Sequence, residues 1–133
     1  MTGRLIDRPE RVFQLWAFTV GMNRLLLRST KSGSYPTRVD VLFQNVKAIK
    51  LPTQLDGLVV TEVGPGREAE IIEETGLLPD EQTVFFEVAS SGRTGFVVAG
   101  VVVEDEDEGE YFEPSKYWPG PDGRVRTVYA SST

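Results

Sequence analysis

The sequence predicts a mainly β protein, either an antiparallel barrel or a two-layer sandwich of about seven or eight strands with one short helix. Short segments rich in β-branched and aromatic residues recur along the chain between turn signals. The links between them are too short for parallel crossovers, which favours antiparallel pairing. The length of 133 residues fits one β-rich domain, 1–133, built around a single hydrophobic core.

The first half of the chain predicts an antiparallel meander over Val12–Val63. In one of its segments, 37–43, inward-facing apolar residues alternate with Arg38 and Asp40 on the solvent side. The pair Asp56-Gly57 is typical of a hairpin turn. The expected strands are Val12–Val20, Arg24–Ser29, Thr37–Phe43, Val46–Leu51 and Leu58–Val63.

One helix is expected, at Arg67–Thr75, and Gly76 directly after it is typical of a helix stop. Beyond the helix, Thr83–Ala89 and Gly95–Val103 are expected to pair as a hairpin across residues 90–94. Both strands are nearly continuous in apolar residues. We therefore expect both of their faces to be covered and this hairpin to form the centre of the core.

The C-terminal part is polar and rich in turn residues. Residues 104–110 hold six acids in seven positions, which predicts a solvated acidic loop. A segment rich in Pro and Gly follows at 111–133 and ends in a predicted edge strand, Arg124–Tyr129. An exposed edge strand is a route to self-association, so a homo-oligomer is one of the open predictions.

The two parts of the chain carry opposite charge. Residues 1–50 contain nine Lys or Arg against three Asp or Glu, a net charge of +6. Residues 51–133 contain five against seventeen, a net charge of −12. This separation indicates either internal pairing of the two parts or a charged surface for a partner. Of these two we favour the surface for a partner.

The chain contains no histidine and no cysteine, which excludes the commonest catalytic and metal-binding arrangements. No catalytic residue, cofactor or metal site is therefore predicted. The longest apolar run, Gly95–Val103, is about half of the ~20 residues that a membrane-spanning helix needs. The sequence thus predicts a protein that does not cross a membrane, and the absence of cysteine favours the cytoplasm.

Two short motifs invite a ligand and are better explained without one. The run Gly64-Pro65-Gly66-Arg67-Glu68-Ala69 matches a dinucleotide-binding fingerprint, with Glu87 at the distance of the ribose-binding acid. However, Glu68 and Glu70 would repel a phosphate at the N-terminus of so short a helix. An ordinary turn from strand to helix explains the motif.

The second motif lies in the acidic segment. Asp105, Asp107 and Gly109 match the start of an EF-hand loop. The sixth and twelfth positions, which that loop requires to be Gly and Glu, are here Glu110 and Lys116. A solvated acidic loop accounts better for this composition.

The basic N-terminal part also invites nucleic-acid binding, through Arg24, Arg28, Arg38, Lys47 and Lys50. The whole chain is acidic, with an isoelectric point near 4.7, and its exposed aromatic residues cannot be identified. Nucleic acid is therefore not the partner that we predict.

These observations favour a non-catalytic protein-binding module that uses an acidic surface to bind a basic protein partner. Inhibitors and immunity proteins are small acidic binders of the same general type. This chain is compared with them by analogy and not through a shared motif. The alternative is a small-molecule-binding β-barrel or a carboxylate-dependent enzyme, in which Trp16, Phe18, Tyr117 and Trp118 line a cavity rather than a core. The predicted contact acids are Glu104, Asp105, Glu106, Asp107, Glu108 and Glu110, with Tyr111 and Phe112 as apolar anchors.

Overall fold

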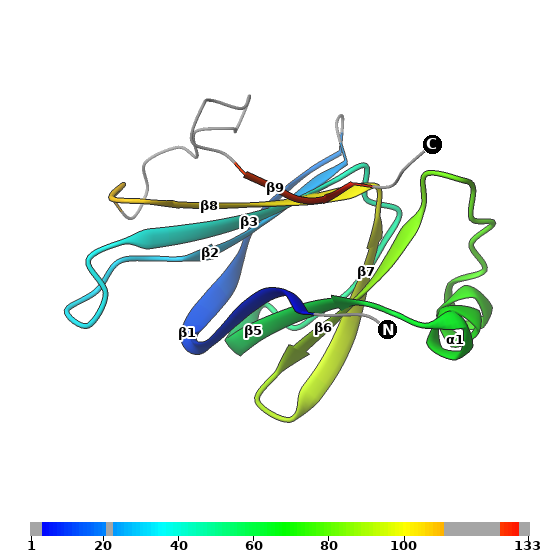
Figure 1. Cartoon of the computed structure of the whole chain (residues 1–133), viewed down its shortest axis with the longest axis horizontal. Coiled ribbons are helices and arrows are strands. Elements are labelled where there is room, and N and C mark those ends of the chain that lie inside the picture. Colours follow the sequence, from blue (N-terminus) through cyan, green and yellow to red (C-terminus); the bar gives the residue numbers. More distant parts are fainter. Residues whose placement is uncertain (1–3, 21–22, 111–125, 131–133) are drawn as a thin grey trace.

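The computed structural model contains one antiparallel β-sheet of nine strands and one α-helix (Figure 1). The structure describes residues 4–20, 23–110 and 126–130, the last of these as backbone only. The strand order is β4-β7-β6-β5-β1-β2-β3-β8-β9. The two outermost strands, β4 and β9, do not pair with each other, so the sheet does not close into a barrel. The mainly β fold class is confirmed, in its sandwich-like form.

Nine strands and one helix follow one another along the described part of the chain. They are β1 (Arg4–Thr19), β2 (Arg24–Ser29), β3 (Arg38–Gln44), β4 (Ala48–Lys50), β5 (Gln54–Glu62), α1 (Pro65–Thr75), β6 (Val84–Ser90), β7 (Arg93–Ala99), β8 (Val101–Asp107) and β9 (Arg126–Ala130).

The long strand β1 joins the two layers of the sandwich. Its N-terminal part pairs with β5, and its C-terminal part pairs with β2. Figure 1 shows β2, β3 and β8 crossing above β5, β6 and β7. The apolar side chains between the two layers form one cluster because strand residues alternate in direction. Its fully buried members include Phe13, Leu25, Leu27, Val41, Phe43, Leu58, Val60, Phe86 and Val97.

The predicted meander over Val12–Val63 is correct for its first three strands only. The third, β3, is followed by Asn45, whose φ of 58° lies in the left-handed region. The chain then crosses to the other layer, where β4 pairs with β7 and β5 pairs with β1. Turn signals mark where a strand ends, but they do not reveal which strand the chain pairs with next.

The pair Asp56-Gly57 lies within β5, opposite a β-bulge in β1, and does not form the hairpin turn that its sequence suggests. Gly57 has a φ of 85°. Opposite it, the pairing of β1 with β5 shifts between Arg8 and Val12. The bulge holds Pro9, which has no amide hydrogen to lose from the ladder.

The segment predicted as one strand, Gly95–Val103, is two strands in different layers. It breaks at Gly100, whose N–H donates to the carbonyl of Gln44 at 3.0 Å. A glycine fits this break because the Asn45 side chain lies close to where a Cβ would be. The hairpin across residues 90–94 is confirmed, and both faces of β6 and β7 are covered.

The helix α1 covers one end of the outer face of β6 and β7. Ile71 is fully buried there against Phe85, Phe96 and Val98. The helix ends as predicted at Gly76, whose φ is 74° and whose N–H donates to Ile72 O at 2.8 Å. Among the described residues, no helix has the length and apolar character needed to cross a membrane.

The predicted acidic loop at 104–110 is wrong for its first four residues, which belong to β8. They pair with β3, where Arg38 lies opposite Asp107 and Val41 lies opposite Glu104. A run of acids can form a strand here because Arg38 of β3 and Arg8 of β1 pair with three of them, Asp107, Glu104 and Glu106. The predicted edge strand is confirmed in position, since β9 pairs with β8 and ends the sheet.

Candidate functional site

Acids and arginines form a row on one face of three neighbouring strands, β2, β3 and β8. On one face of the sheet, Arg28 of β2 lies opposite Asp40 of β3, which in turn lies opposite Asp105 of β8. One step along, Arg38 of β3 lies opposite Asp107 of β8. Because side chains on one face recur every second residue, the register places these charges side by side.

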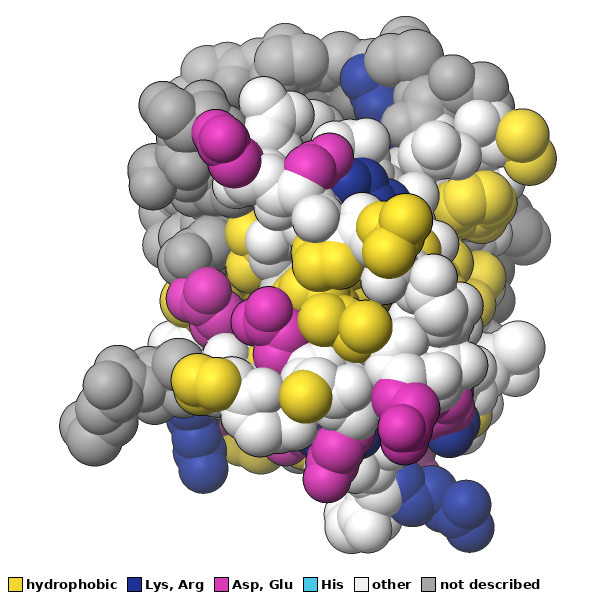
Figure 2. All heavy atoms as spheres, turned by 90° about the vertical axis from the view of Figure 1, so that its right-hand side faces the viewer, with side chains coloured by type: hydrophobic (Ala, Val, Ile, Leu, Met, Phe, Trp, Pro, Cys, Tyr) yellow, Lys and Arg dark blue, Asp and Glu magenta, His cyan; other side chains and the backbone are white. Residues whose placement is uncertain are grey.

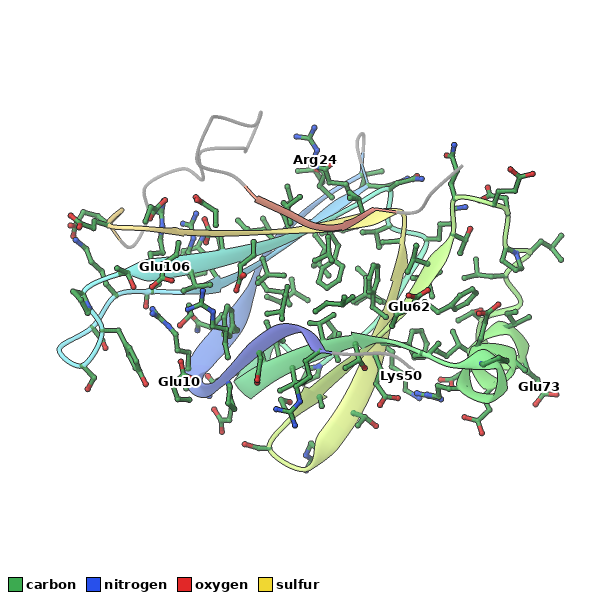
Figure 3. The ribbon with its side chains drawn as sticks, viewed as in Figure 1. Glu10, Arg24, Lys50, Glu62, Glu73 and Glu106 are labelled. Atoms are coloured by element: carbon green, nitrogen blue, oxygen red, sulfur yellow. The ribbon has the colours of Figure 1, made fainter. Side chains whose placement is uncertain are left out.

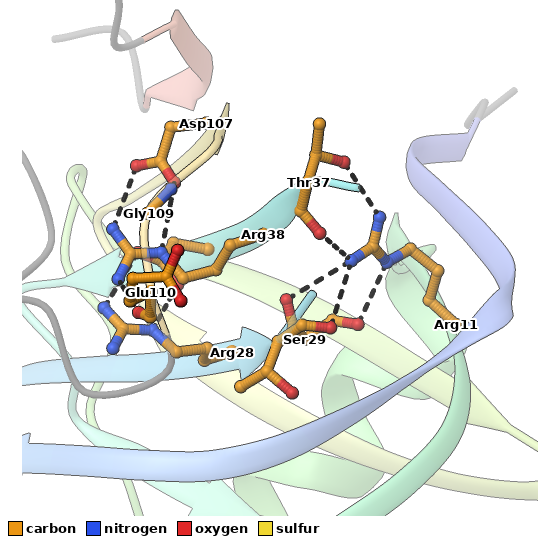
Figure 4. A network of polar contacts seen from close by, with 10 residues as sticks. Arg11, Arg28, Ser29, Thr37, Arg38, Asp107, Gly109 and Glu110 are labelled. Atoms are coloured by element: carbon orange, nitrogen blue, oxygen red, sulfur yellow. Dashed lines mark hydrogen bonds and ion pairs between the residues drawn. The ribbon is translucent and has the colours of Figure 1, made fainter. Parts of the chain in front are cut away.

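The contacts in this row are bidentate and buried (Figure 4). Arg28 donates from Nε and Nη2 to the two oxygens of Asp40, at 2.8 and 3.1 Å. Arg38 donates in the same way to Asp107, at 3.1 and 3.0 Å. The side chains of both pairs are only 1–2% exposed. Trp16 covers the first pair, with its ring 5.1 Å from the guanidinium carbon of Arg28.

The same network fixes the chain just after β8. Arg38 Nη1 donates to the carbonyl of Glu110 at 2.9 Å, and the N–H of Gly109 donates to Asp107 Oδ1 at 2.8 Å. Burial alone would raise the pKa of Asp107. The hydrogen bonds from Arg38 and Gly109, with the positive charge of Arg38, outweigh it and hold that pKa below its usual range.

A second group of charges lies on the inner face, at the open end of the sandwich. Arg8 donates to Glu104 at 2.9 Å and to Glu106 at 3.0 Å. Thr37 Oγ1 donates to Glu106 at 2.6 Å. This hydroxyl bond, followed by the contact with Arg8, lowers the pKa of Glu106 despite its partial burial. Arg11, turned inward beside the bulge in β1, donates to Ser29 Oγ at 3.0 Å.

The predicted contact residues therefore have different environments. Glu104, Asp105 and Asp107 are buried, at 7%, 3% and 5% exposure. Glu106 is exposed and is bound by Arg8, and the exposed Glu110 pairs with Lys31. Glu108 is exposed. Tyr111 and Phe112 lie outside the described residues, as do Tyr117 and Trp118.

The charge separation in the sequence is thus explained largely by internal pairing. Arginines of the basic N-terminal part bind acids of β8 on both faces of the sheet. Hydrogen bonds from Arg38 to Asp107, and from Thr37 and Arg8 to Glu106, stabilise these two carboxylates in the charged form. This makes them structural groups that are poorly suited to take up a proton as a general base.

A different acidic surface, outside the predicted contact residues, lies on α1 and the loop after it. Glu70, Glu73 and Glu81 are exposed there, and Leu78 is 92% exposed. Figure 2 shows acidic side chains around a group of hydrophobic side chains on the face that carries this helix. The sequence contains a signal for this surface, because two leucines, Leu77 and Leu78, directly follow the helix stop at Gly76. In the structure Leu77 packs against the core and Leu78 does not.

The dinucleotide motif does not form a phosphate site among the described residues. The strands on either side of α1, β5 and β6, are antiparallel, so α1 is not the crossover of a parallel unit. Glu87, the proposed ribose-binding acid, accepts a hydrogen bond from Arg67 at 3.3 Å.

The space between the two layers is filled by the apolar cluster described above. Within the described chain, Trp16 packs on an outer-face cluster with Leu26, Leu42 and Val103 instead of lining a lumen. No family model, curated protein or solved structure matches this chain. Its function is therefore inferred from its own surfaces.

Proposed function

We propose that this protein is a non-catalytic binding module that attaches to a basic protein surface through the acidic surface of α1 and residues 76–82. We call this the helix surface. The observation that carries the proposal is Leu78, a large apolar side chain that is 92% exposed beside exposed glutamates. An exposed leucine of this kind is a suitable anchor for a partner, since interface cores are apolar and their rims are charged.

Charge supports the same surface. Within the described residues, Glu73 and Glu81 have no ion-pair partner, whereas Glu70 pairs with Arg67 and Glu74 pairs with Lys50. Unpaired surface acids give long-range attraction to a basic partner and raise its association rate, which falls with added salt. Glu104, Glu106 and Asp107 of β8 are less suited to this role because arginines already bind them.

Contact of a partner with the sequence-predicted residues at the end of β8 stays a prediction. Glu106, Glu108 and Glu110 are its exposed members among the described residues, and the predicted anchors Tyr111 and Phe112 lie outside them. The cytoplasm as the compartment and pairing of two copies through β9 are also proposals. Sedimentation across a range of concentrations tests the pairing, because a monomer at every concentration would contradict it.

The test begins with the full chain immobilised and exposed to a lysate of the source organism at low salt. Proteins released by salt are identified, and the principal one is purified for titration against the free chain. We expect saturable binding that weakens at least tenfold in Glu73→Gln/Glu81→Gln and in Leu78→Ser. Cytochrome c serves as an unrelated basic protein that reports non-specific attraction.

The matched control is Glu10→Gln, which removes one exposed acid at the other end of the molecule (Figure 3). This variant should bind the partner like the unmodified chain. Glu108→Gln serves as the probe of the sequence-predicted residues. Equal binding by the helix-surface variants and the control would contradict the proposed surface. Loss of binding in Glu108→Gln alone would move the site to the end of β8.

A further inference from the structure

A hollow opens beside the end of β4. Its volume is about 490 Å³, within the range of small-molecule sites. Leu55 and Val88, both members of the core cluster, reach its floor. The lining side chains that bear on ligand binding are Lys50, Leu51, Leu55, Val88, Arg93 and Thr94.

The hollow exists because β4 is too short to cover its neighbour. Its last residue, Lys50, pairs with Phe96 of β7. Continued in the same register, Pro52 would lie opposite Thr94, and proline has no amide hydrogen for a ladder bond. The chain departs instead into β5, and no described strand covers this part of the β7 edge.

This uncovered edge offers backbone hydrogen bonds. The N–H of Lys47 donates to the carbonyl of Val98 at 2.7 Å, so Val98 presents its backbone toward β4. Backbone direction alternates along a strand, and Thr94 is four residues before Val98. Thr94 therefore presents its N–H and C=O to the same side as Val98, and Thr94 is one of the residues that line the hollow.

Two positively charged residues, Lys50 and Arg93, line the same hollow, although the net charge of the protein is −6. The guanidinium of Arg93 is exposed and makes no hydrogen bond or ion pair with any residue that the structure describes. Lys50 Nζ donates to Glu74 at 2.6 Å, and its ammonium group keeps two further donors. An anion here would gain charge-assisted hydrogen bonds without first breaking a contact of Arg93.

We propose that this hollow binds a small organic anion that carries an apolar group. Arg93 and Lys50, with the edge of Thr94, hold the acid group, and the apolar group packs on Leu51, Leu55 and Val88. Carboxylates and phosphate monoesters share this chemistry. None of the residues that line this hollow belongs to α1 or to 76–82, and Lys50 alone among its proposed ligands contacts α1, through Glu74.

The test is a titration of the isotope-labelled full chain, followed by NMR, with hexanoate, hexyl phosphate, hexanol and inorganic phosphate. We expect at least one of the two organic anions to saturate, with the largest shifts at the amides of Leu51, Thr94 and Gly95. Hexanol and inorganic phosphate should bind at least about tenfold more weakly. The preferred anion then identifies the acid group as carboxylate or phosphate.

Two variants and one control complete the design. Arg93→Gln should weaken binding about tenfold, whereas Arg4→Gln, a matched change at another exposed arginine, should leave it unchanged. In the series butanoate, hexanoate and octanoate, affinity should rise about two- to fourfold per methylene, and Leu51→Ala should reduce this gain. Shifts elsewhere, no saturation by either anion below about 10 mM, or full binding by a folded Arg93→Gln would overturn the proposal.

Discussion

Arg38 and Asp107 face each other across β3 and β8 and are joined by two parallel hydrogen bonds of 3.1 and 3.0 Å, with both side chains almost fully buried. The pair also reaches beyond the sheet, because Arg38 binds the carbonyl of Glu110 and Asp107 accepts the N–H of Gly109. This ion pair thus joins β8 to β3 and also holds the backbone of residues 109 and 110, which follow β8.

Breaking this pair should be costly. In Asp107→Asn the buried Arg38 loses the opposing charge, and we expect the free energy of unfolding to fall by about 3 kcal/mol or more. Urea denaturation at pH 7 measures the loss. Glu108→Gln, at the exposed position next in the chain, should change stability by less than about 0.5 kcal/mol. Equal stability of the two variants would show that the pair is not coupled to folding.

The same pair provides a sharper test in a double-mutant cycle. Arg38→Met alone leaves Asp107 buried without its main partner, whereas Arg38→Met/Asp107→Leu removes both charges. The double variant should therefore be destabilised by less than the sum of the single variants, because neither member of the pair is left buried without the other. Strict additivity would contradict a direct interaction of the two side chains.

Acid should destabilise the protein through Asp107 and Glu106, whose pKa values are lowered in the folded state. A lowered carboxyl pKa contributes stability that is complete above the unfolded-state value, about 4, and is lost as pH falls through the folded-state value. The free energy of unfolding should therefore drop below about pH 4. Urea midpoints between pH 7 and pH 3 measure this drop, and it should be smaller in Asp107→Asn.

The fold class, the positions of most strands and the helix end at Gly76 could be predicted from local patterns. The pairing of strands across the sheet could not be predicted in this way. The alternation in β3 indicates that one of its faces is buried, but it does not indicate that β8 is the neighbouring strand. For the same reason the acids from Glu104 to Asp107 resemble a solvated loop in the sequence. Their arginine partners come from residues more than sixty positions away, and no local signal connects Arg38 with Asp107.

A local signal also misled at Gly57, and this gives a further prediction. The residue has a φ of 85°, and a Cβ there would lie 2.7 Å from the carbonyl oxygen of Pro9. Gly57→Ala should therefore lower the free energy of unfolding by about 1–3 kcal/mol, through the positive φ and the clash together. Thermal unfolding checks this, with Gly33→Ala as the control, since nothing lies near that position. Equal melting temperatures would show that the bulge can relax.

The helix α1 offers a final prediction that separates its structural face from its free face. Ile71 is fully buried against β6 and β7, whereas Leu78 is 92% exposed just beyond the helix. Ile71→Ala should cost about 2–4 kcal/mol of stability because it leaves a cavity, and Leu78→Ser should cost less than about 0.5 kcal/mol. If Leu78→Ser proved as destabilising as Ile71→Ala, Leu78 would be packed in solution. The apolar anchor of the proposed helix surface would then not be available to a partner.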